Sequence, residues 1–260
     1  MTRMTSDPPV KSVKTAFDIV ELLVEHGTAG LSTVASDLDL PKSTVHDHLT
    51  TLRQQGYVGK VGQEYKANLK FLELGGKIRG NLDLFDVAEQ ELQKVANTTG
   101  EHTSLMVTEG EIGVYVYTAP GDHLQQVIVP IGTHTRLHVS APGKAILAHL
   151  PEEQRRKLMT DDYLKPVTDQ TITDPETLRA ELEEIREAKQ ALDNEEGQEG
   201  LQGIAKPIFS RETGEVLGAI SVYGPSGRAN MEFLRGEALK SLERAANVIE
   251  HELRIASDGQ

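Results

Sequence analysis

PKSTVHDHLTTLRQQG, residues 41–56, is the stretch that decides how the first part of the chain folds. Val45, Leu49 and Leu52 recur at helical spacing and form one apolar stripe, so the stretch predicts a helix with one buried face. Pro41 stands in its first turn, where a missing N–H costs nothing. The residues opposite the stripe are short and polar. Such a helix suits a DNA major groove, but an ordinary surface helix has the same pattern, and the neighbouring segments decide between the two.

The segments on both sides of this helix complete the pattern of a winged helix-turn-helix. Upstream, residues 12–26 are amphipathic, and residues 32–38 predict a short helix with Ser32 as its N-cap. Downstream, residues 57–60 and 63–66 predict two short strands joined by a glycine-containing turn. The order helix, helix, turn, helix, hairpin is typical of a DNA-binding module with a wing.

We expect residues 11–68 to form a DNA-binding domain whose second motif helix enters the major groove. Its short polar side chains should set sequence preference, while Lys42, Arg53 and Lys60 should position phosphates. The expected partner is double-stranded DNA with a pseudo-palindromic operator, because a homodimer doubles the few base contacts of one module. The expected DNA contacts are Ser32, Thr33, Lys42, Ser43, Thr44, His46, Asp47, Thr50, Arg53 and Lys60.

Composition limits the remaining classes of protein. The chain has 260 residues, which leaves room for two domains, and it has no cysteine and no run of 18 apolar residues. These features predict a cytoplasmic protein without a disulfide, a thiolate metal site or a membrane span. Residues 1–10 lack the apolar core of a signal peptide and are expected to form a disordered arm.

The acidic charge is unevenly distributed. Residues 1–70 contain 8 Lys and Arg against 8 Asp and Glu, whereas residues 71–260 contain 19 against 32. The expected DNA module is therefore neutral and poorly equipped for phosphate attraction, which normally supplies much of the affinity. A salt-rich cytosol would explain this balance, because counterion release contributes little there and acidic surfaces keep proteins soluble. A halophilic archaeal source and an ordinary acidic regulator both stay open.

The second part of the chain predicts an α+β domain over residues 82–256, joined by a linker helix over residues 69–81. Gly75–Gly76 should weaken or kink that linker helix. Beyond it, helices alternate with short apolar strands, which predicts helices packed on one mostly antiparallel sheet. The expected helices cover residues 82–97, a segment starting near 142, 151–159, 175–190 and 231–255, and the expected strands cover 103–108, 112–118, 125–131, 201–209 and 215–223.

Three segments of this second domain resemble the sensor domain of the IclR family of transcription regulators. They are LHVSAPGKAILA (137–148), ALDNEEGQEGLQGIAKPIF (191–209) and LGAISVYGP (217–225). Residues 12–58 resemble that family's winged helix-turn-helix, so the resemblance extends from about Ser12 to Leu253. It implies a GAF-like effector-binding domain, homodimers or dimers of dimers, and control of catabolic genes by a small organic metabolite.

The resemblance also implies where the metabolite binds. The family's pocket lies beside the start of a helix and uses an acidic residue in a turn and positions on the last strands. The expected effector contacts are Leu124, Val127, Ala141, Pro142, Gly143, Asp193, Gly203, Ser221 and Tyr223. Family members often have Cys at the position of Gly203 and Ser at that of Tyr223. The identity of the effector therefore does not follow from the family.

The helix that starts near Pro142 predicts a carboxylate site. The N–H groups of Gly143 and Lys144 are expected to lack intrahelical partners and to lie at the positive end of the helix dipole. The alternative is that Pro142 to Lys144 only caps the helix.

Ser221 and Tyr223 are expected to donate hydrogen bonds toward this carboxylate site, and Asp193 favours hydroxyl groups on the same ligand. Ser221 and Tyr223 alternate on one predicted strand, so both side chains leave the same face. Asp193, expected in the turn before the next strand, can accept hydrogen bonds from hydroxyl groups. Together with the helix start, these residues favour a hydroxylated organic acid, such as a sugar acid.

Other chemistry has less support in the sequence. Gly143-Lys144 lacks the flanking residues of a phosphate-binding loop, and Ser221 does not stand in a nucleophile elbow. We find no nucleophile or general base with a partner at a recognisable spacing, so no catalytic residue and no cofactor are expected. An enzyme or a scaffold protein with an added DNA-binding module is the alternative function.

The chain contains nine histidines. Some of them could meet on neighbouring strands as metal ligands, but exposed or hydrogen-bonded histidines are the favoured interpretation, and we expect no metal site. The four that could converge are His102, His123, His134 and His138.

Overall fold

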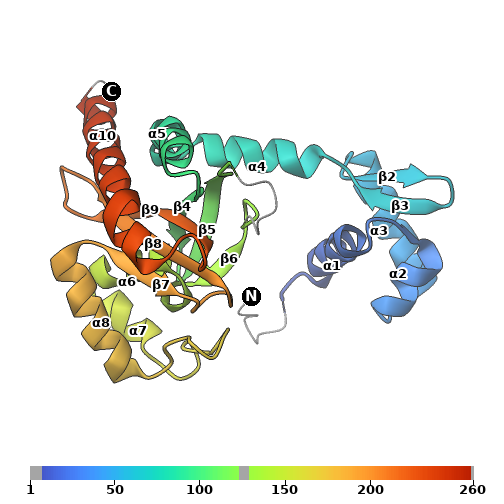
Figure 1. The fold of residues 1–260 in the computed structure, drawn as a ribbon. Helices are drawn as coiled ribbons and strands as arrows, with labels where there is room; N and C mark the ends of the chain where they lie inside the picture. The colour runs from blue at the N-terminus through green and yellow to red at the C-terminus, as the bar shows by residue number, and fades with distance from the viewer. Residues whose placement is uncertain (1–7, 123–128, 259–260) are drawn as a thin grey trace. The chain divides into compact units, whose positions relative to one another are not determined.

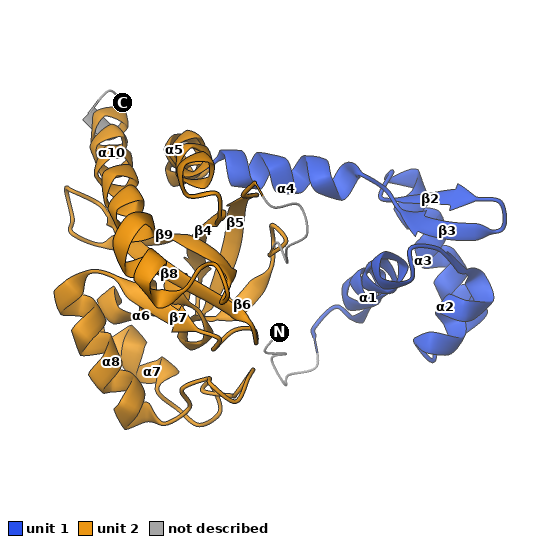
Figure 2. Ribbon diagram, in the orientation of Figure 1, with its two compact units in different colours: residues 1–81 blue, residues 82–260 orange. Residues whose placement is uncertain are grey.

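A computed structural model describes residues 8–122 and 129–258, which divide into two units, residues 1–81 and 82–260 (Figure 2). Each unit has its own hydrophobic core. The sequence therefore places two independent sets of apolar faces on either side of Asn81.

Unit 1 is the expected winged helix-turn-helix (Figure 1). Three short strands form an antiparallel sheet in the order β1-β3-β2, with β2 and β3 as the wing hairpin. The apolar stripe of α3 packs inward, because Val45 and Leu49 are fully buried against Ile19 and Leu23 of α1. The elements are α1 (Lys11–His26), β1 (Ala29–Gly30), α2 (Leu31–Asp37), α3 (Lys42–Gln54), β2 (Val58–Val61) and β3 (Glu64–Ala67).

The start of α2 differs from the prediction. Ser32 is not the N-cap, because the helix already begins at Leu31. Gly30 takes the cap position in an extended conformation and pairs with Glu64 of the wing. The short strand thus fixes where the helix begins, and no side chain caps it.

The linker segment forms α4 (Lys70–Gly80), a helix that continues through Gly75 and Gly76. None of its residues is buried within the chain, and Leu69, just before its first turn, and Leu72 are 82% and 70% exposed. These two leucines therefore leave most of their surface uncovered, whereas Phe71 of the same helix packs on Tyr57, with 5.0 Å between the ring centroids.

Unit 2 is built on one six-stranded sheet in the order β6-β5-β4-β9-β8-β7, in which every described neighbour pair is antiparallel. This confirms the α+β fold with helices on a mostly antiparallel sheet. The strands are β4 (His102–Glu109), β5 (Ile112–Ala119), β6 (His134–Arg136), β7 (Ala191–Asn194), β8 (Leu201–Phe209) and β9 (Val216–Pro225).

Helices cover both faces of this sheet (Figure 1). On one face α5 and α10 pack on the apolar side chains of β4, β8 and β9, and on the other face α6, α7 and α8 enclose a second core. The helices are α5 (Asp83–Thr99), α6 (Ala141–His149), α7 (Glu152–Leu158), α8 (Pro175–Ala188), α9 (Met231–Phe233) and α10 (Leu239–Asp258).

Two strand predictions need correction. Residues 129–131, the described part of the strand expected over 125–131, are not a strand, and the edge strand is β6 instead, which pairs with β5. Strand β7 was not predicted, and it places Asp193 opposite Gly203 rather than in a turn. A strand of four residues that ends in two polar side chains is too short to show alternation, so only its pairing with β8 identifies β7.

Candidate DNA-binding and effector-binding sites

Helix α3 presents the polar face that the sequence predicted. Ser43, His46, Asp47 and Arg53 are exposed, as is Lys42 at the first helical position. Thr50 is half-buried. Because the opposite face holds α3 against the core, these polar side chains carry no packing role and are available to a ligand.

The side of α3 that faces α1 is different. Thr44 and Asp47 line a shallow groove together with Val13 and Phe17 of α1. Thr44 is half-buried there, whereas Asp47 is exposed. Helical geometry thus places Thr44 on a different flank of α3 from His46 and Arg53.

The wing and α2 carry the remaining predicted contacts. Lys60 in β2 is exposed, and its ammonium lies 5.5 Å from the ring centroid of Tyr65 on the paired strand β3. Ser32 and Thr33 are exposed on α2. The hairpin therefore holds Lys60 at a defined place on the wing.

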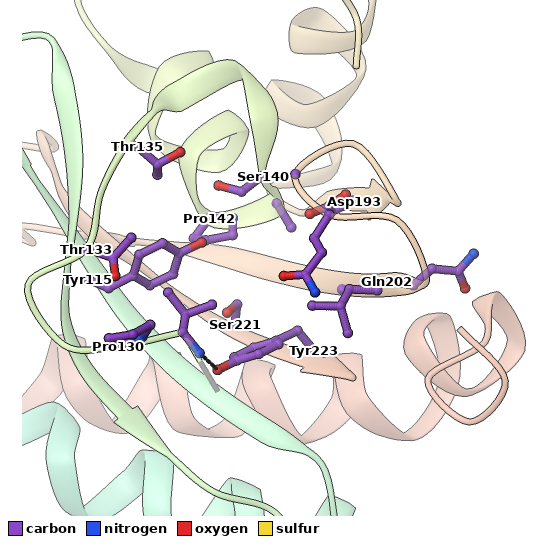
Figure 3. A pocket seen from close by; sticks show the side chains of 16 residues that line it. Tyr115, Pro130, Thr133, Thr135, Ser140, Pro142, Asp193, Gln202, Ser221 and Tyr223 are labelled. Atoms are coloured by element: carbon purple, nitrogen blue, oxygen red, sulfur yellow. Dashed lines mark hydrogen bonds between the residues drawn. The ribbon is translucent and has the colours of Figure 1, made fainter. Parts of the chain in front are cut away.

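The predicted effector residues of unit 2 meet around one cavity of about 270 Å³ (Figure 3). It opens between the first turn of α6, the β5–β6 connection, and strands β8 and β9. The lining residues are Tyr115, Val129, Pro130, Thr133, Thr135, Ser140, Ala141, Pro142, Asp193, Gly197, Gln198, Leu201, Gln202, Gly203, Ser221 and Tyr223.

Six of the nine predicted residues line this cavity: Ala141, Pro142, Asp193, Gly203, Ser221 and Tyr223. Gly143 does not, because it faces the preceding backbone, where an added Cβ would lie 2.3 Å from the carbonyl oxygen of Leu137. Leu124 and Val127 lie outside the described residues.

The start of α6 is not the open anion site that the sequence suggested. The N–H of Gly143 donates to Ser140 Oγ at 3.3 Å, and the N–H of Lys144 donates to the Ser140 carbonyl oxygen at 2.8 Å. Both groups therefore have partners. Ser140 is the N-cap that sequence reasoning missed, and a Ser directly before an Ala-Pro helix start is the signal that identifies it.

Asp193 is the one charged side chain on the described lining of the cavity. Its Oδ1 accepts the N–H of Glu196 at 2.8 Å. Burial, and then the nearby negative charge of Glu196, raise the pKa of Asp193 to about 7, although the Glu196 N–H and the Lys144 ammonium act in the opposite direction. Near neutral pH this carboxyl can therefore both donate and accept hydrogen bonds.

A buried ion-pair network lies behind Asp193. Lys144 is fully buried, and its Nζ donates to Glu181 Oε1 and Glu196 Oε1, both at 2.6 Å. These carboxylates raise the pKa of Lys144 despite its burial. Glu196 Oε2 has no hydrogen-bond partner among the described residues. The cluster thus holds three carboxyl groups around one ammonium, which favours a proton on one of the carboxyls.

The floor of the cavity is formed by paired strands. Ser221 is buried and shares a 2.6 Å hydrogen bond with Ser104 on β4. The Tyr223 hydroxyl accepts the N–H of Val129 at 3.2 Å, so this ring also holds part of the β5–β6 connection (Figure 3).

Gly203 and Tyr223 are directly opposite in the ladder between β8 and β9. A Cβ added at Gly203 would lie 3.1 Å from the Tyr223 Cβ. The two departures from the family pattern therefore lie side by side, and a side chain in place of the glycine would crowd the base of the tyrosine side chain.

Several polar residues of the cavity were not predicted, chiefly Tyr115, Thr133, Thr135, Ser140 and Gln202. Most supply hydroxyl groups, and burial strongly raises the pKa of Tyr115, which keeps its hydroxyl protonated. No Lys or Arg is among the described lining residues. Thr133 directly precedes β6 and Thr135 lies in it, but only the folded chain shows that both line the same cavity as Asp193.

Across residues 8–122 and 129–258, no three His, Asp or Glu side chains gather as ligands of a metal ion would. His123 lies outside these ranges. None of the helices in the same ranges combines the length and apolar composition that a membrane crossing requires.

Comparisons with known proteins match both units. The family described as "Bacterial transcriptional regulator IclR C-terminal" matches residues 77–251, and "IclR helix-turn-helix domain" matches residues 12–62. A relative from Halobacterium salinarum, "Probable HTH-type transcriptional regulator ArcR", is 33% identical over 256 residues, 95% of each chain.

Two further relatives extend this similarity. The HTH-type transcriptional regulator KdgR of Escherichia coli is 31% identical and covers 92% of this chain and 91% of its own. The crystal structure of the Thermotoga maritima IclR superimposes with a TM-score of 0.82 at 28% identity, covering 94% of this chain and 98% of that one. These relatives are named as regulators of transcription, not as enzymes.

Proposed function

The chain belongs to the IclR family of DNA-binding transcriptional regulators, and we propose that it controls catabolic genes in response to a small hydroxylated organic acid bound in the cavity of unit 2. One observation carries the ligand class: the cavity surrounds a single carboxyl, Asp193, with neutral hydroxyl and amide groups. Such a lining suits a ligand with several hydroxyl groups.

The described lining contains no Lys or Arg, so neutral hydrogen-bond donors must bind the acid group of the effector. Hydroxyls such as those of Tyr115 and Tyr223 can donate to a carboxylate, and burial raises the pKa of both. Because the pKa of Asp193 is raised to about 7, this carboxyl can also donate its proton to the ligand. A sugar acid satisfies both requirements, with its carboxylate shared among these donors and its hydroxyls accepted by the remaining oxygens.

The effector site is tested by two matched substitutions. Ser221→Ala and Ser104→Ala remove the same 2.6 Å hydrogen bond, but only Ser221 lines the cavity. We expect Ser221→Ala to lose the response of operator binding to sugar acids and to keep DNA binding, whereas Ser104→Ala keeps both. Equal effector responses in Ser221→Ala, Asp193→Ala and the unmodified protein would move the site elsewhere.

On DNA the protein is proposed to act as a homodimer or a dimer of dimers on a pseudo-palindromic operator. One winged module offers few base contacts, and two-fold pairing doubles them on half-sites about one helical turn or a multiple apart. Sedimentation and footprinting on the upstream region of its own gene test this. A monomer that protects one unrepeated half-site would rule out the dimer. A gel-shift experiment on the same DNA that shows no binding would favour a scaffold role.

Within the module, two classes of contact are proposed. Ser43, Thr44, His46 and Asp47 set sequence preference, whereas Lys42, Arg53 and Lys60, with support from Ser32, Thr33 and Thr50, position the backbone. Asp47→Ala should relax preference at particular base pairs. Lys60→Ala should weaken all sequences alike and reduce the salt slope by about one. The opposite pair of results would reverse the two roles.

We place the DNA-binding domain at residues 11–68, the linker helix at 69–81 and the effector domain at 82–256, in a cytoplasmic protein of a halophile. The net charge of −13 supports the salt-rich setting, as does the relative from Halobacterium salinarum. Folding and operator binding should improve in molar KCl. Full activity in dilute buffer together with its loss in molar KCl would contradict this assignment.

A further inference from the structure

Unit 2 contains a second cavity, of about 580 Å³, at the opposite ends of α6 and β8 from the first. It lies where the last residue of α6, the C-terminal end of α8, the end of β8 and the middle of α10 meet. The two cavities have no lining residue in common. The second cavity therefore does not extend the effector pocket.

The cavity opens at an unpaired stretch of sheet edge. Strand β7 begins at Ala191, opposite Ala205, so within the described register residues 206–209 of β8 have no strand on that side. Pro207 lies in this stretch and has no N–H to offer. Since proline at an edge hinders strand addition, the opening suits a small molecule better than an added β-strand.

Three cations line this cavity in the acidic part of the chain: Arg186, Lys189 and Lys206. Arg186 pairs with Glu183, and Lys206 lies 3.6 Å from Glu243. The other acidic residue of the lining, Glu250, lies 3.7 Å from Arg211 and accepts the N–H of Phe209.

Lys189 is the cation left over from this pairing. It has no carboxylate within ion-pair distance among the described residues, and its Nζ lies 5.5 Å from the centroid of the Phe209 ring. The cavity thus presents one unneutralised positive charge beside an apolar ring. A negative group at Lys189 with an apolar body against Phe209 would satisfy both.

His149 adds an unsatisfied acceptor. Its Nδ1 lies 2.9 Å from the carbonyl oxygen of Ala145, which can only accept, so Nδ1 carries the proton. Burial, and then the charges of Lys189 and Arg155, lower the pKa of His149, which keeps the ring neutral. Its Nε2 is buried without a partner in the described part of the chain. Because His149 lines the cavity, a ligand hydroxyl that reaches Nε2 would supply the missing donor.

We propose that this cavity binds a small organic anion with an apolar body and a hydroxyl group, held by Lys189, Phe209 and His149. The negative group is a carboxylate or a phosphate. Mandelate has the carboxylate, the ring and the hydroxyl, phenyl phosphate replaces the carboxylate by a phosphate, and 1-phenyl-1,2-ethanediol is the neutral counterpart.

Titration calorimetry of the full-length protein with these three compounds tests the proposal. We expect both anions to bind and the diol to bind at least fivefold more weakly. Asparagine suits the positive φ of 50° at Lys189. Lys189→Asn should weaken binding of both anions about fivefold, the upper range for an exposed charge pair. Lys240→Asn, an exposed residue of α10 outside the lining, should change nothing.

Two controls locate the binding. Ser221→Ala alters the effector cavity only, so the Lys189-dependent binding should persist in that background. Nitrogen NMR of the histidine side chains is recorded on the protein with Lys189 intact. Addition of mandelate should shift the His149 Nε2 signal. No binding of either anion, equal binding of the diol, loss in Ser221→Ala or an unmoved His149 signal would each overturn the assignment.

Discussion

Asp193→Asn should stabilise the protein at alkaline pH and leave it unchanged in acid. The pKa of this carboxyl is about 7 in the folded chain against an ordinary value of 3.8, and burial is the main cause. Between these values the unfolded state loses its proton while the folded state keeps it, so deprotonation favours unfolding. The free energy of unfolding attributable to Asp193 is therefore retained below about pH 4 and falls as the pH rises towards 7.

The size of this effect follows from the shift of roughly three pKa units, at 1.36 kcal/mol each, which gives at most about 4 kcal/mol at pH 8. Protonation changes at Glu196 can absorb part of this, so we expect Asp193→Asn to raise the free energy of unfolding by about 2 to 4 kcal/mol at pH 8. Asparagine is nearly isosteric and cannot ionise, and its side-chain oxygen can still accept the N–H that Glu196 donates at 2.8 Å.

Urea unfolding followed by circular dichroism from pH 4 to pH 8, at constant salt, measures the difference for unit 2. Asp162→Asn is the matched control, because the Asp162 side chain is 98% exposed and should give a small difference at every pH. A stability difference between Asp193→Asn and the unmodified protein that stays flat across this range would refute the reasoning. So would destabilisation by Asp193→Asn at pH 8.

Three further results are expected. Because the pKa of Asp193 is about 7, affinity for an acid effector should be full below pH 7 and fall about tenfold per pH unit above it. Calorimetry in two buffers should show proton uptake on binding, and pH-independent affinity would contradict this. Lys144→Met should lower the free energy of unfolding by about 3 to 5 kcal/mol, because it leaves two carboxylate partners unpaired. In denaturant titrations the double variant Lys144→Met/Glu196→Gln should recover part of this loss, and no recovery would argue against the ion-pair explanation. Gly203→Ala should lower stability by about 1 kcal/mol and change effector affinity, because the added Cβ would press on Tyr223. Gly227→Ala is the control, because open space surrounds Gly227, and it should affect neither thermal stability nor effector binding.

Local periodicity in the sequence determined much of this protein. The stripe of Val45, Leu49 and Leu52 is a property of one helix, so it predicted α3 and its polar outer face without any knowledge of the partners. Strands such as β8 were predicted over their full length, residues 201–209, because apolar runs between turn residues are also local. The family segments further predicted six residues that line the 270 Å³ cavity of unit 2.

Tertiary structure decided what local patterns cannot contain. Ser104 and Ser221 meet across 117 positions of sequence, and the register that pairs them depends on the packing of a whole sheet. The same is true of Lys144, which the sequence placed at an open helix start. Its burial between Glu181 and Glu196 is set by three separate segments. Its ammonium offsets only part of the rise in the pKa of the cavity carboxyl, which that carboxyl's own burial chiefly causes. A residue's type determines which hydrogen bonds and charges it can offer, but the distance and the dielectric that give those groups their strength exist only once remote segments are packed together.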